Sequence, residues 1–335
     1  MKHVIKRTLG LLLASLLLCA VAPLTASAAP GDVCEIVGGS TYATLDAAIG
    51  AVENGQTVRL LAGITLDDTF YIDRKRTFAL DTNGKTLDFD GNSFIITNYE
   101  SNVTINGCEK LVNLRSVSVN GSMANYGLPL YKTVFNGNLT LDGQFCVAGY
   151  AHAVINGNMT FPTADGAMGN LYSGSKLEIK GSVTANKLAP GDAFVGVTAS
   201  EITIEGNLVT SGAAATMNGG KLTVNGNATA NGICGAYFFA GGGSIFINGT
   251  FTANETKYAG FTGGSLDDCG YCAKTQVKSI VKYGGVNYRL YERNECPGAL
   301  YVKADGAFIF GTTYESTFWN WVKFIVLFGW IWMWF

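Results

Sequence analysis

The sequence is poor in charged residues, proline and histidine. Asp, Glu, Lys and Arg make up only 14% of the 335 residues, and the net charge is −2. No basic stripe exists that could neutralise nucleic-acid phosphates, so we expect no nucleic-acid partner. Proline occurs 6 times, and 48% of the chain is hydrophobic. Because this hydrophobic content can bury a core, the sequence predicts a folded protein and not a disordered one.

Glycine, in contrast, is abundant, with 43 residues, and it marks an internal repeat. One short phrase recurs in four related forms: KLEIKGSVTAN, EITIEGNLVTSG, KLTVNGNATANG and SIFINGTFTAN. Each copy has a glycine at the same place, and successive copies are 25, 20 and 23 residues apart. These four glycines are Gly181, Gly206, Gly226 and Gly249. A period of this length is typical of a solenoid, in which each unit buries its apolar face against its neighbours.

Apolar residues alternate with polar ones on both sides of each repeated glycine. In the third copy, Leu222 and Val224 precede Gly226 and Ala228 follows it, with polar side chains between them. This period of two indicates short strands, and each unit has room for three of them. The density of glycine excludes helical repeats, and the leucine-rich consensus is absent. The sequence therefore predicts an all-β, right-handed parallel β-helix with about 20–25 residues per coil.

The invariant glycine and its asparagine neighbours have a structural explanation. We expect the glycine to turn a corner in every coil, where the backbone angles favour a residue without Cβ. The neighbouring asparagines tolerate the same turn and can form a hydrogen-bonded ladder between coils. They are Asn207, Asn225, Asn227 and Asn248.

Both ends of the solenoid need a cover, because an open coil exposes core residues and unpaired strand edges. At the N-terminal end, Thr44 can cap a helix that carries Leu45, Ala48, Ile49 and Val52 at helical spacing, and a buried strand follows from Thr57. We assign residues 29–264 to the β-helix with this helical cap. Residues 265–316 form a C-terminal cap or small β unit, with a hairpin joined at Gly284–Gly285.

The N-terminus resembles an export signal. Lys2, Lys6 and Arg7 precede an uncharged apolar stretch, and small residues at Ala26 and Ala28 suit cleavage before Ala29. Residues 1–28 are therefore predicted to be a signal peptide of an exported protein, found outside the cell, on its surface or at its membrane. The alternative is an uncleaved membrane anchor.

The C-terminal tail, residues 317–335, differs in composition from the rest of the chain. It holds all five tryptophans, which are Trp319, Trp321, Trp330, Trp332 and Trp334. Its apolar stretch is close to the length of a bilayer-spanning helix, and its tryptophans lie at both ends, where indole rings prefer the membrane interfaces. We expect the tail to retain the protein at the membrane by insertion or by lying in the interface. The alternative is packing against the C-terminal β unit.

The cysteines do not form an evident disulfide framework, since an odd, scattered set of seven follows the signal peptide. Cys269 and Cys272 form a CxxC motif, interpreted as a local disulfide or two thiols. A zinc site needs four ligands, and only Cys296 lies near this motif, with no histidine. Cys146 and Cys234, in apolar strand-like contexts, are interpreted as buried core residues.

The signal peptide, the stretch YATLDAAIGAVENGQTVRLLAGITLDDTFYI and the Gly- and Asn-punctuated strands together resemble a known group. Residues 1–264 are similar to secreted surface proteins of clostridia-like bacteria in the pectin-lyase-like β-helix superfamily. The resemblance implies a right-handed β-helix outside the cell. Many such proteins are adhesin-like, and others are polysaccharide lyases or hydrolases.

Enzymes of that superfamily act through acidic residues with arginine, lysine or histidine, often with Ca²⁺. After the signal peptide the only histidine is His152, which we interpret as a strand residue. Two adjacent acid pairs exist, Asp67–Asp68 and Asp267–Asp268. Neighbouring strand residues point to opposite faces, so neither pair alone provides the two facing carboxylates of a glycosidase.

Two further stretches have charged side chains. Asp88 and Asp90 are expected on one strand face, where they are weak candidates for Ca²⁺, although a turn with a solvated face is favoured. The stretch Asp73–Thr77, with two arginines and a lysine, could hold an anionic sugar, but a polar turn between strands is favoured. No cofactor is assigned.

The outward positions of the coils are rich in threonine, serine and asparagine, as at Thr203, Thr223, Thr229 and Thr252. Aromatic residues accompany them in longer segments, at Tyr237, Phe238, Phe239 and Tyr258. Such a surface suits a glycan or protein partner. We therefore predict a cell-surface β-helix protein for adhesion or binding. The alternative is a polysaccharide lyase or glycoside hydrolase acting on an acidic polysaccharide.

Overall fold

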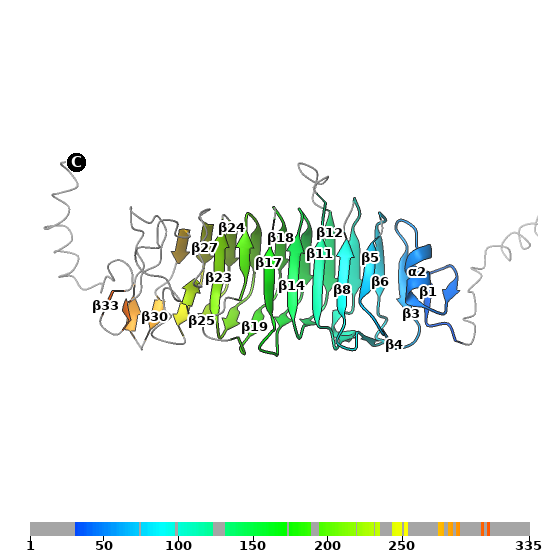
Figure 1. Ribbon diagram of the computed structural model, residues 1–335, viewed down its shortest axis with the longest axis horizontal. Coiled ribbons are helices and arrows are strands. Elements are labelled where there is room, and N and C mark those ends of the chain that lie inside the picture. Colours follow the sequence, from blue (N-terminus) through cyan, green and yellow to red (C-terminus); the bar gives the residue numbers. More distant parts are fainter. Residues whose placement is uncertain are drawn as a thin grey trace, which may run out of the picture.

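The computed structural model describes residues 31–253 except 74, 98–99, 123–130, 173, 189–193, 219, 231, 235–242 and 250, and strands at 274–277, 281–283, 286–288, 303–304 and 307–308. In this part the chain is a parallel β-helix with very little helix (Figure 1). This confirms the predicted all-β solenoid.

Each coil contributes strands to three faces, numbered here in the order in which the chain visits them. The first face contains β3 (Thr57–Leu60), β6 (Phe78–Asp81), β9 (Val103–Asn106), β12 (Lys132–Asn136), β15 (His152–Asn156), β18 (Lys176–Ile179), β21 (Glu201–Ile204), β24 (Gly220–Val224), β27 (Gly243–Ile247) and β29 (Lys274–Val277). Neighbouring strands in this order are parallel.

The second face is made of shorter strands in two sheets. They are β4 (Ile64–Thr65), β7 (Leu87–Asp88) and β10 (Leu111–Val112), then β13 (Leu139–Thr140), β16 (Met159–Thr160), β19 (Val183–Ala185), β22 (Leu208–Thr210), β25 (Ala228–Ala230), β28 (Phe251–Ala253) and β30 (Val281–Tyr283). A short 3-10 helix, Cys108–Lys110, precedes β10.

The third face is one sheet of eight strands. They are β5 (Phe70–Asp73), β8 (Ser93–Thr97), β11 (Ser116–Asn120), β14 (Gln144–Ala148), β17 (Ala167–Leu171), β20 (Gly196–Thr198), β23 (Ala213–Asn218) and β26 (Gly232–Cys234).

The core is a stack of like side chains in register from coil to coil. Ile179, Ile204 and Val224 are partners in successive first-face strands, and Ile247 follows them; all four have 0% exposure. Phenylalanines fill the N-terminal coils, where the ring centroids of Phe89 and Phe94 lie 5.4 Å apart. The alternation read from the sequence is therefore confirmed, because the apolar positions point inward and Thr203 and Thr223 point outward.

The explanation expected for the repeated glycine is wrong in one respect. None of Gly181, Gly206, Gly226 and Gly249 has a left-handed backbone. They are instead stacked backbone on backbone: the Gly226 N–H donates to the Gly206 carbonyl at 3.0 Å, and a Cβ on Gly226 would lie 2.5 Å from that oxygen. The recurring constraint is therefore the close approach of successive coils, which leaves no room for a side chain.

The predicted asparagine ladder is present, as two rows beside the glycine stack. Before the glycine, the Asn136 amide donates to Asn106 Oδ1 at 2.7 Å, and Asn248 donates to Asn225 Oδ1 at 2.6 Å. After the glycine, the Asn227 N–H donates to Asn207 Oδ1 at 2.8 Å. These bonds satisfy polar groups on an exposed corner and link one coil to the next.

The predicted N-terminal cap is confirmed. Helix α2 (Leu45–Ala51) begins after Thr44, whose Oγ1 accepts a hydrogen bond from the Ala47 N–H at 3.2 Å. Leu45, Ala48 and Ile49 are buried and belong to the hydrophobic core. Strands β1 (Cys34–Ile36) and β2 (Thr41–Tyr42) complete the cap, with β1 antiparallel to β3.

At the C-terminal end the predicted hairpin is present as backbone. Strand β30 pairs antiparallel with β31 (Val286–Tyr288), with Tyr283 opposite Val286. However, β29 and β30 also pair in parallel with β27 and β28, so the solenoid ladders continue into the segment expected to be a separate cap. A second antiparallel pair joins β32 (Lys303–Ala304) and β33 (Ala307–Phe308).

Candidate functional site

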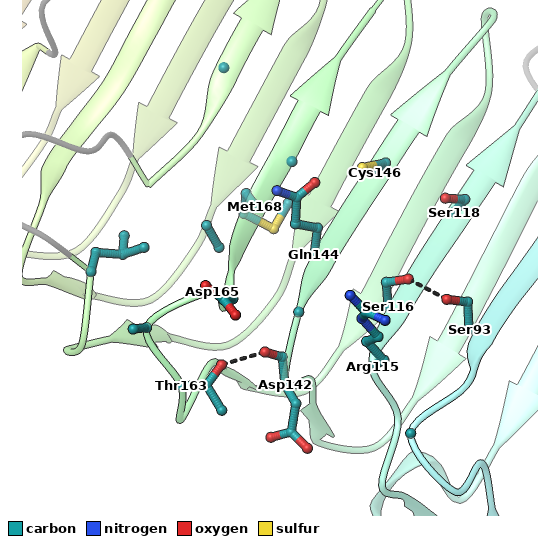
Figure 2. A pocket seen from close by; sticks show the side chains of 17 residues that line it. Ser93, Arg115, Ser116, Ser118, Asp142, Gln144, Cys146, Thr163, Asp165 and Met168 are labelled. Atoms are coloured by element: carbon teal, nitrogen blue, oxygen red, sulfur yellow. Dashed lines mark hydrogen bonds between the residues drawn. The ribbon is translucent and has the colours of Figure 1, made fainter.

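An open cleft of about 1220 Å³ lies on the outer side of the third face. Its floor consists of outward side chains from β8, β11 and β14, namely Ser93, Ser116, Ser118, Gln144 and Cys146 (Figure 2). The cleft runs across the strands from β8 to β20, where Gly196 lines it. Since neighbouring strands are about 4.8 Å apart, this span of four spacings is roughly 19 Å.

One side of the cleft is built by the connections that enter the third face. Arg115 precedes β11, Asp142 precedes β14, and Thr163 and Asp165 lie on the connection from β16 to β17. The Thr163 hydroxyl donates to the backbone carbonyl of Asp142 and ties two successive connections together. The side chains of Arg115, Asp142 and Asp165 are exposed.

A β-bulge distorts the sheet in the middle of the cleft. The register between β14 and β17 shifts between Phe145 and Val147, so that Gly169 and Asn170 stand opposite Cys146 alone. A Cβ on Gly169 would lie 2.2 Å from Cys146 Sγ, so only glycine fits beside this thiol. Bulges are common next to binding and catalytic sites because they redirect side chains. Cys146 is half-buried, which corrects the expectation of a fully buried residue.

Most polar side chains of the cleft have no partner within the described part of the chain. Ser93 and Ser116 share a hydrogen bond of 2.7 Å between their hydroxyls. No side-chain hydrogen bond or ion pair to a described residue is made by Arg115, Gln144 or Asp165. In Figure 2 the carboxylate of Asp142 points away from Asp165 and Gln144. The cleft thus presents one cation, two carboxylates, an amide and hydroxyls to solvent.

The outer side of the first face is different, because its charges bind one another. Glu178 accepts from Lys176 at 2.8 Å, from Lys180 at 2.9 Å and from His152 Nε2 at 3.1 Å. His152 is only 4% exposed and lies in register with Lys176. We call these four residues the Glu178 network.

The Glu178 network shifts the pKa values of its members. Hydrogen bonds from Lys176 and Lys180 lower the pKa of Glu178 to about 2. Burial lowers the pKa of His152, and the positive charges of Lys176 and Lys132 add to this effect, while Glu178 opposes it. At neutral pH the network therefore contains an ionised carboxylate and a neutral imidazole.

The Ca²⁺ candidates Asp88 and Asp90 do not lie on one strand. Strand β7 ends at Asp88, and Asp90 occupies a left-handed position with φ +49° in the following turn. Asp88 Oδ1 accepts hydrogen bonds from the Asp90 N–H at 2.9 Å and from the Asn113 amide at 2.8 Å. Within the described residues, no three His, Cys, Asp or Glu side chains are close enough to hold a metal ion.

The other charged candidates lie in turns or at the end of a strand. Asp67 and Asp68 are exposed between β4 and β5, and Asp68 Oδ1 accepts from the Thr69 N–H at 3.2 Å. Asp73 ends β5, and Arg76 donates to the carbonyl of Val52 at 2.5 Å, next to the helical cap. The favoured interpretation of Asp73–Thr77 as a polar connection between strands agrees with this position.

Several predicted residues lie outside the described part of the chain. They are the signal peptide 1–28, Tyr237, Phe238, Phe239, Tyr258, Asp267, Asp268, Cys269, Cys272, Cys296 and the tail 317–335. Among the helices that are described, none has the length and apolar character needed to cross a bilayer.

Cys34 and Cys108 are buried thiols, and burial raises their pKa values to about 11 and about 12.

Sequence reasoning missed the residues of the cleft. Arg115, Asp142 and Asp165 are isolated charges, each in a different connection, and the four aligned copies of the repeat do not include them. A usable signal existed in the LDG and ADG tripeptides that place Asp142 and Asp165 immediately before a glycine and a strand.

Together the fold and the cleft define a parallel β-helix protein with a polar cleft across one face, an arrangement compatible with the pectin-lyase-like β-helix. No protein-family model, curated protein or solved structure matches the chain.

Proposed function

We propose that this protein is an exported cell-surface adhesin that binds a glycan in the cleft of the third face. The observation that carries the proposal is the set of amide and charged side chains that line one cleft without partners among the described residues, beside the hydroxyls of its floor. Sugars present many hydroxyl groups, and a glycan could provide both donors and acceptors to such a surface.

The shape of the cleft suits a chain-like ligand. It is open along its length and crosses five strands, and its floor follows the regular spacing of the coils. Sugars that lie along the solenoid axis would meet polar floor groups at β8, β11 and β14, and small or apolar residues at β17 and β20. Ser116 and Ser118 on β11 and Gln144 on β14 would contact the ligand from the floor, and Arg115 and Asp165 from the side.

The proposed location rests on the two ends of the sequence. The predicted signal peptide would export the chain, and the Trp-rich tail would hold it at the outer face of the membrane. Truncation after Ser316 should then release folded protein into the medium, whereas the full chain stays with the membrane fraction. An equally soluble full-length protein would overturn this part of the proposal.

Glycan binding can be tested on a glycan array with the purified protein lacking residues 317–335. We expect retention of one class of glycan, and loss of that signal in Gln144→Ala combined with Ser116→Ala. The matched control is Thr203→Ala combined with Thr223→Ala, on the outer side of the first face. No binding to any glycan, or equal binding by both double variants, would contradict the proposed site.

The second candidate is a polysaccharide lyase or glycoside hydrolase, because Asp142, Asp165 and Arg115 line the same cleft. Such an enzyme needs two carboxylates on opposite sides of a sugar bond, or a base with a cation that pairs a uronate. Incubation with acidic polysaccharides, followed by detection of reducing or unsaturated sugar ends, separates the candidates. Product that disappears in Asp142→Asn and Asp165→Asn would favour the enzyme over the adhesin.

A further inference from the structure

The chain contains an unusual number of Asn–Gly dipeptides, ten in all. In this dipeptide the glycine backbone nitrogen can attack the asparagine side-chain carbonyl carbon, because glycine has no Cβ to hinder the approach. A cyclic imide forms and ammonia leaves with the side-chain nitrogen. Water then opens the ring at either carbonyl and gives aspartate or isoaspartate, without any oxidant or cofactor.

The Asn–Gly dipeptides whose glycines lie in the glycine stack, or in the same corner of the coils, are protected from this reaction. The attacking nitrogen of Gly226 already donates its hydrogen to the Gly206 carbonyl at 3.0 Å, and that of Gly249 donates to Gly226 at 3.1 Å. The Gly107 N–H likewise donates to the Asn136 carbonyl at 3.0 Å. Rotation of these backbones is blocked by the neighbouring coil, which also holds the asparagine side chains in the ladder.

Asn156–Gly157 is restrained in another way. The Gly157 N–H makes no hydrogen bond to a described residue, but its carbonyl accepts from the Gly181 N–H at 3.1 Å. A Cβ on Gly157 would lie 2.2 Å from the Gly137 carbonyl oxygen, so the glycine is confined between coils. The Asn156 amide also donates to Asn136 Oδ1 at 2.7 Å.

Asn83–Gly84 lies in a different setting, the turn between β6 and β7. The Lys85 N–H donates to the Thr82 carbonyl at 2.8 Å, and Asn83 and Gly84 between them have φ +52° and +70°. The Gly84 N–H has no acceptor among the described residues, both residues are exposed, and no atom lies within 4 Å of a Cβ placed on Gly84. Among the described residues, the side chain of Asn83 has one hydrogen-bond partner, the Leu60 carbonyl at 3.1 Å.

We propose that Asn83 deamidates fastest among the Asn–Gly dipeptides that the structure describes in full, and that the glycine stack and the asparagine ladder protect the dipeptides of the repeat. The product has a direct structural consequence. A carboxylate at position 83 cannot donate to the Leu60 carbonyl, and it adds a negative charge beside Asp81, whose Oδ1 accepts from the Asn83 N–H at 2.9 Å. Isoaspartate also lengthens the turn by one backbone atom. The reaction therefore loosens the coil next to the N-terminal cap.

The test is peptide mapping by mass spectrometry after the folded, full-length protein has been incubated at mildly alkaline pH in ¹⁸O-labelled water. Label should enter the peptide with Asn83 at least about tenfold faster than the peptides with Asn106, Asn225 or Asn248, because those sites react only after local opening. Denatured protein is the matched control, in which the four sites should react at similar rates.

Equal rates in the folded protein, or faster reaction at a ladder site than at Asn83, would overturn the proposal. The variant Asn83→Asp tests the consequence separately. We expect faster amide hydrogen exchange in β3 and β6 than in the wild type, with unchanged exchange in β21 and β24. Unchanged exchange in β3 and β6 would show that the Leu60 contact does not hold the turn.

Discussion

The outer sides of the first and third faces have polar side chains on the same kind of parallel sheet, but they use them differently. On the first face, Lys176, Lys180 and His152 all bind Glu178. On the third face, Arg115 and Asp165 line one cleft and make no ion pair with any described residue. The first arrangement links neighbouring coils of the protein, whereas the second leaves its charges available to a ligand.

Under the proposed function, the polar residues of the Glu178 network act in folding and those of the cleft act in binding. A charge with a partner inside the protein stabilises the fold when both groups are held in place. A polar group left to solvent adds little to stability and keeps its hydrogen-bonding capacity for another molecule. Substitutions on the two faces should therefore separate stability from binding.

The largest loss of stability is expected from a substitution in the core, which both faces share. Ile204→Asp places an unpaired charge at a position with 0% exposure and should cost several kcal/mol, enough to unfold the solenoid. Thr223→Asp, which points outward on the neighbouring strand, should be tolerated. Urea denaturation followed by circular dichroism measures both, and equal damage would contradict the inward and outward assignment.

The glycine stack comes next. Gly226→Ala would place its Cβ 2.5 Å from the Gly206 carbonyl oxygen, so the coils must separate. We expect a loss of roughly 1–3 kcal/mol in the free energy of unfolding. The control is Gly63→Ala, where the nearest atom would be 3.6 Å away and a change of less than about 1 kcal/mol is expected. A harmless Gly226→Ala would refute the explanation by close approach.

On the first face, Glu178→Gln removes the charge that Lys176, Lys180 and His152 share. It should lower the free energy of unfolding by about 1 kcal/mol, since the network is partly exposed to solvent. Thermal denaturation at low and high salt provides the measurement. A loss that does not shrink at high salt would point to packing and not to charge.

The same network should make the fold sensitive to acid. The pKa of His152 is lowered in the folded state, so its contribution is complete above about pH 6.5 and is lost as the pH falls below that value. Glu178 contributes above about pH 4.5, and that contribution is lost as the pH falls toward about 2. In His152→Gln the loss of stability just below about pH 6.5 should disappear, whereas the loss between about pH 4.5 and about pH 2 should remain. A pH profile identical to that of the wild type would show that His152 is not titrating in this range.

The smallest effect on stability is expected in the cleft. Arg115→Ala, Gln144→Ala and Asp165→Ala remove no side-chain hydrogen bond to a described residue. Each should change the free energy of unfolding by less than about 0.5 kcal/mol. Destabilisation as large as that of Glu178→Gln would mean that the cleft has partners in the fold and would remove the contrast between the faces.

The fold could be predicted from the sequence because the repeat encodes it directly. The alternation around Gly206 and Gly226 defines which side chains stack inward, and the spacing of the copies defines the coil. The helical cap could be predicted in the same way, because Thr44 and the apolar spacing after it are local signals. The reason why the repeat requires glycine could not be predicted, since the distance between two coils is not a local property.

The cleft was not predicted, because the LDG and ADG tripeptides mark only single turns and no repeat unites the residues that line it. Arg115, Asp142 and Asp165 are separated by 20 residues or more, and they meet only through the stacking of three coils. The bulge at Gly169 depends on one extra residue in β17 relative to β14. Such an insertion becomes visible only when the register of the strands is known.

The most direct test of the account is a calorimetric titration of a glycan selected on the array against two variants with the same substitution. Ser118→Trp fills the cleft from the middle of β11, and Thr203→Trp places the same ring on the outer side of β21. We expect Ser118→Trp to abolish binding while it remains folded, and Thr203→Trp to bind like the wild type. Full binding by folded Ser118→Trp would contradict the assignment of the cleft as the binding site.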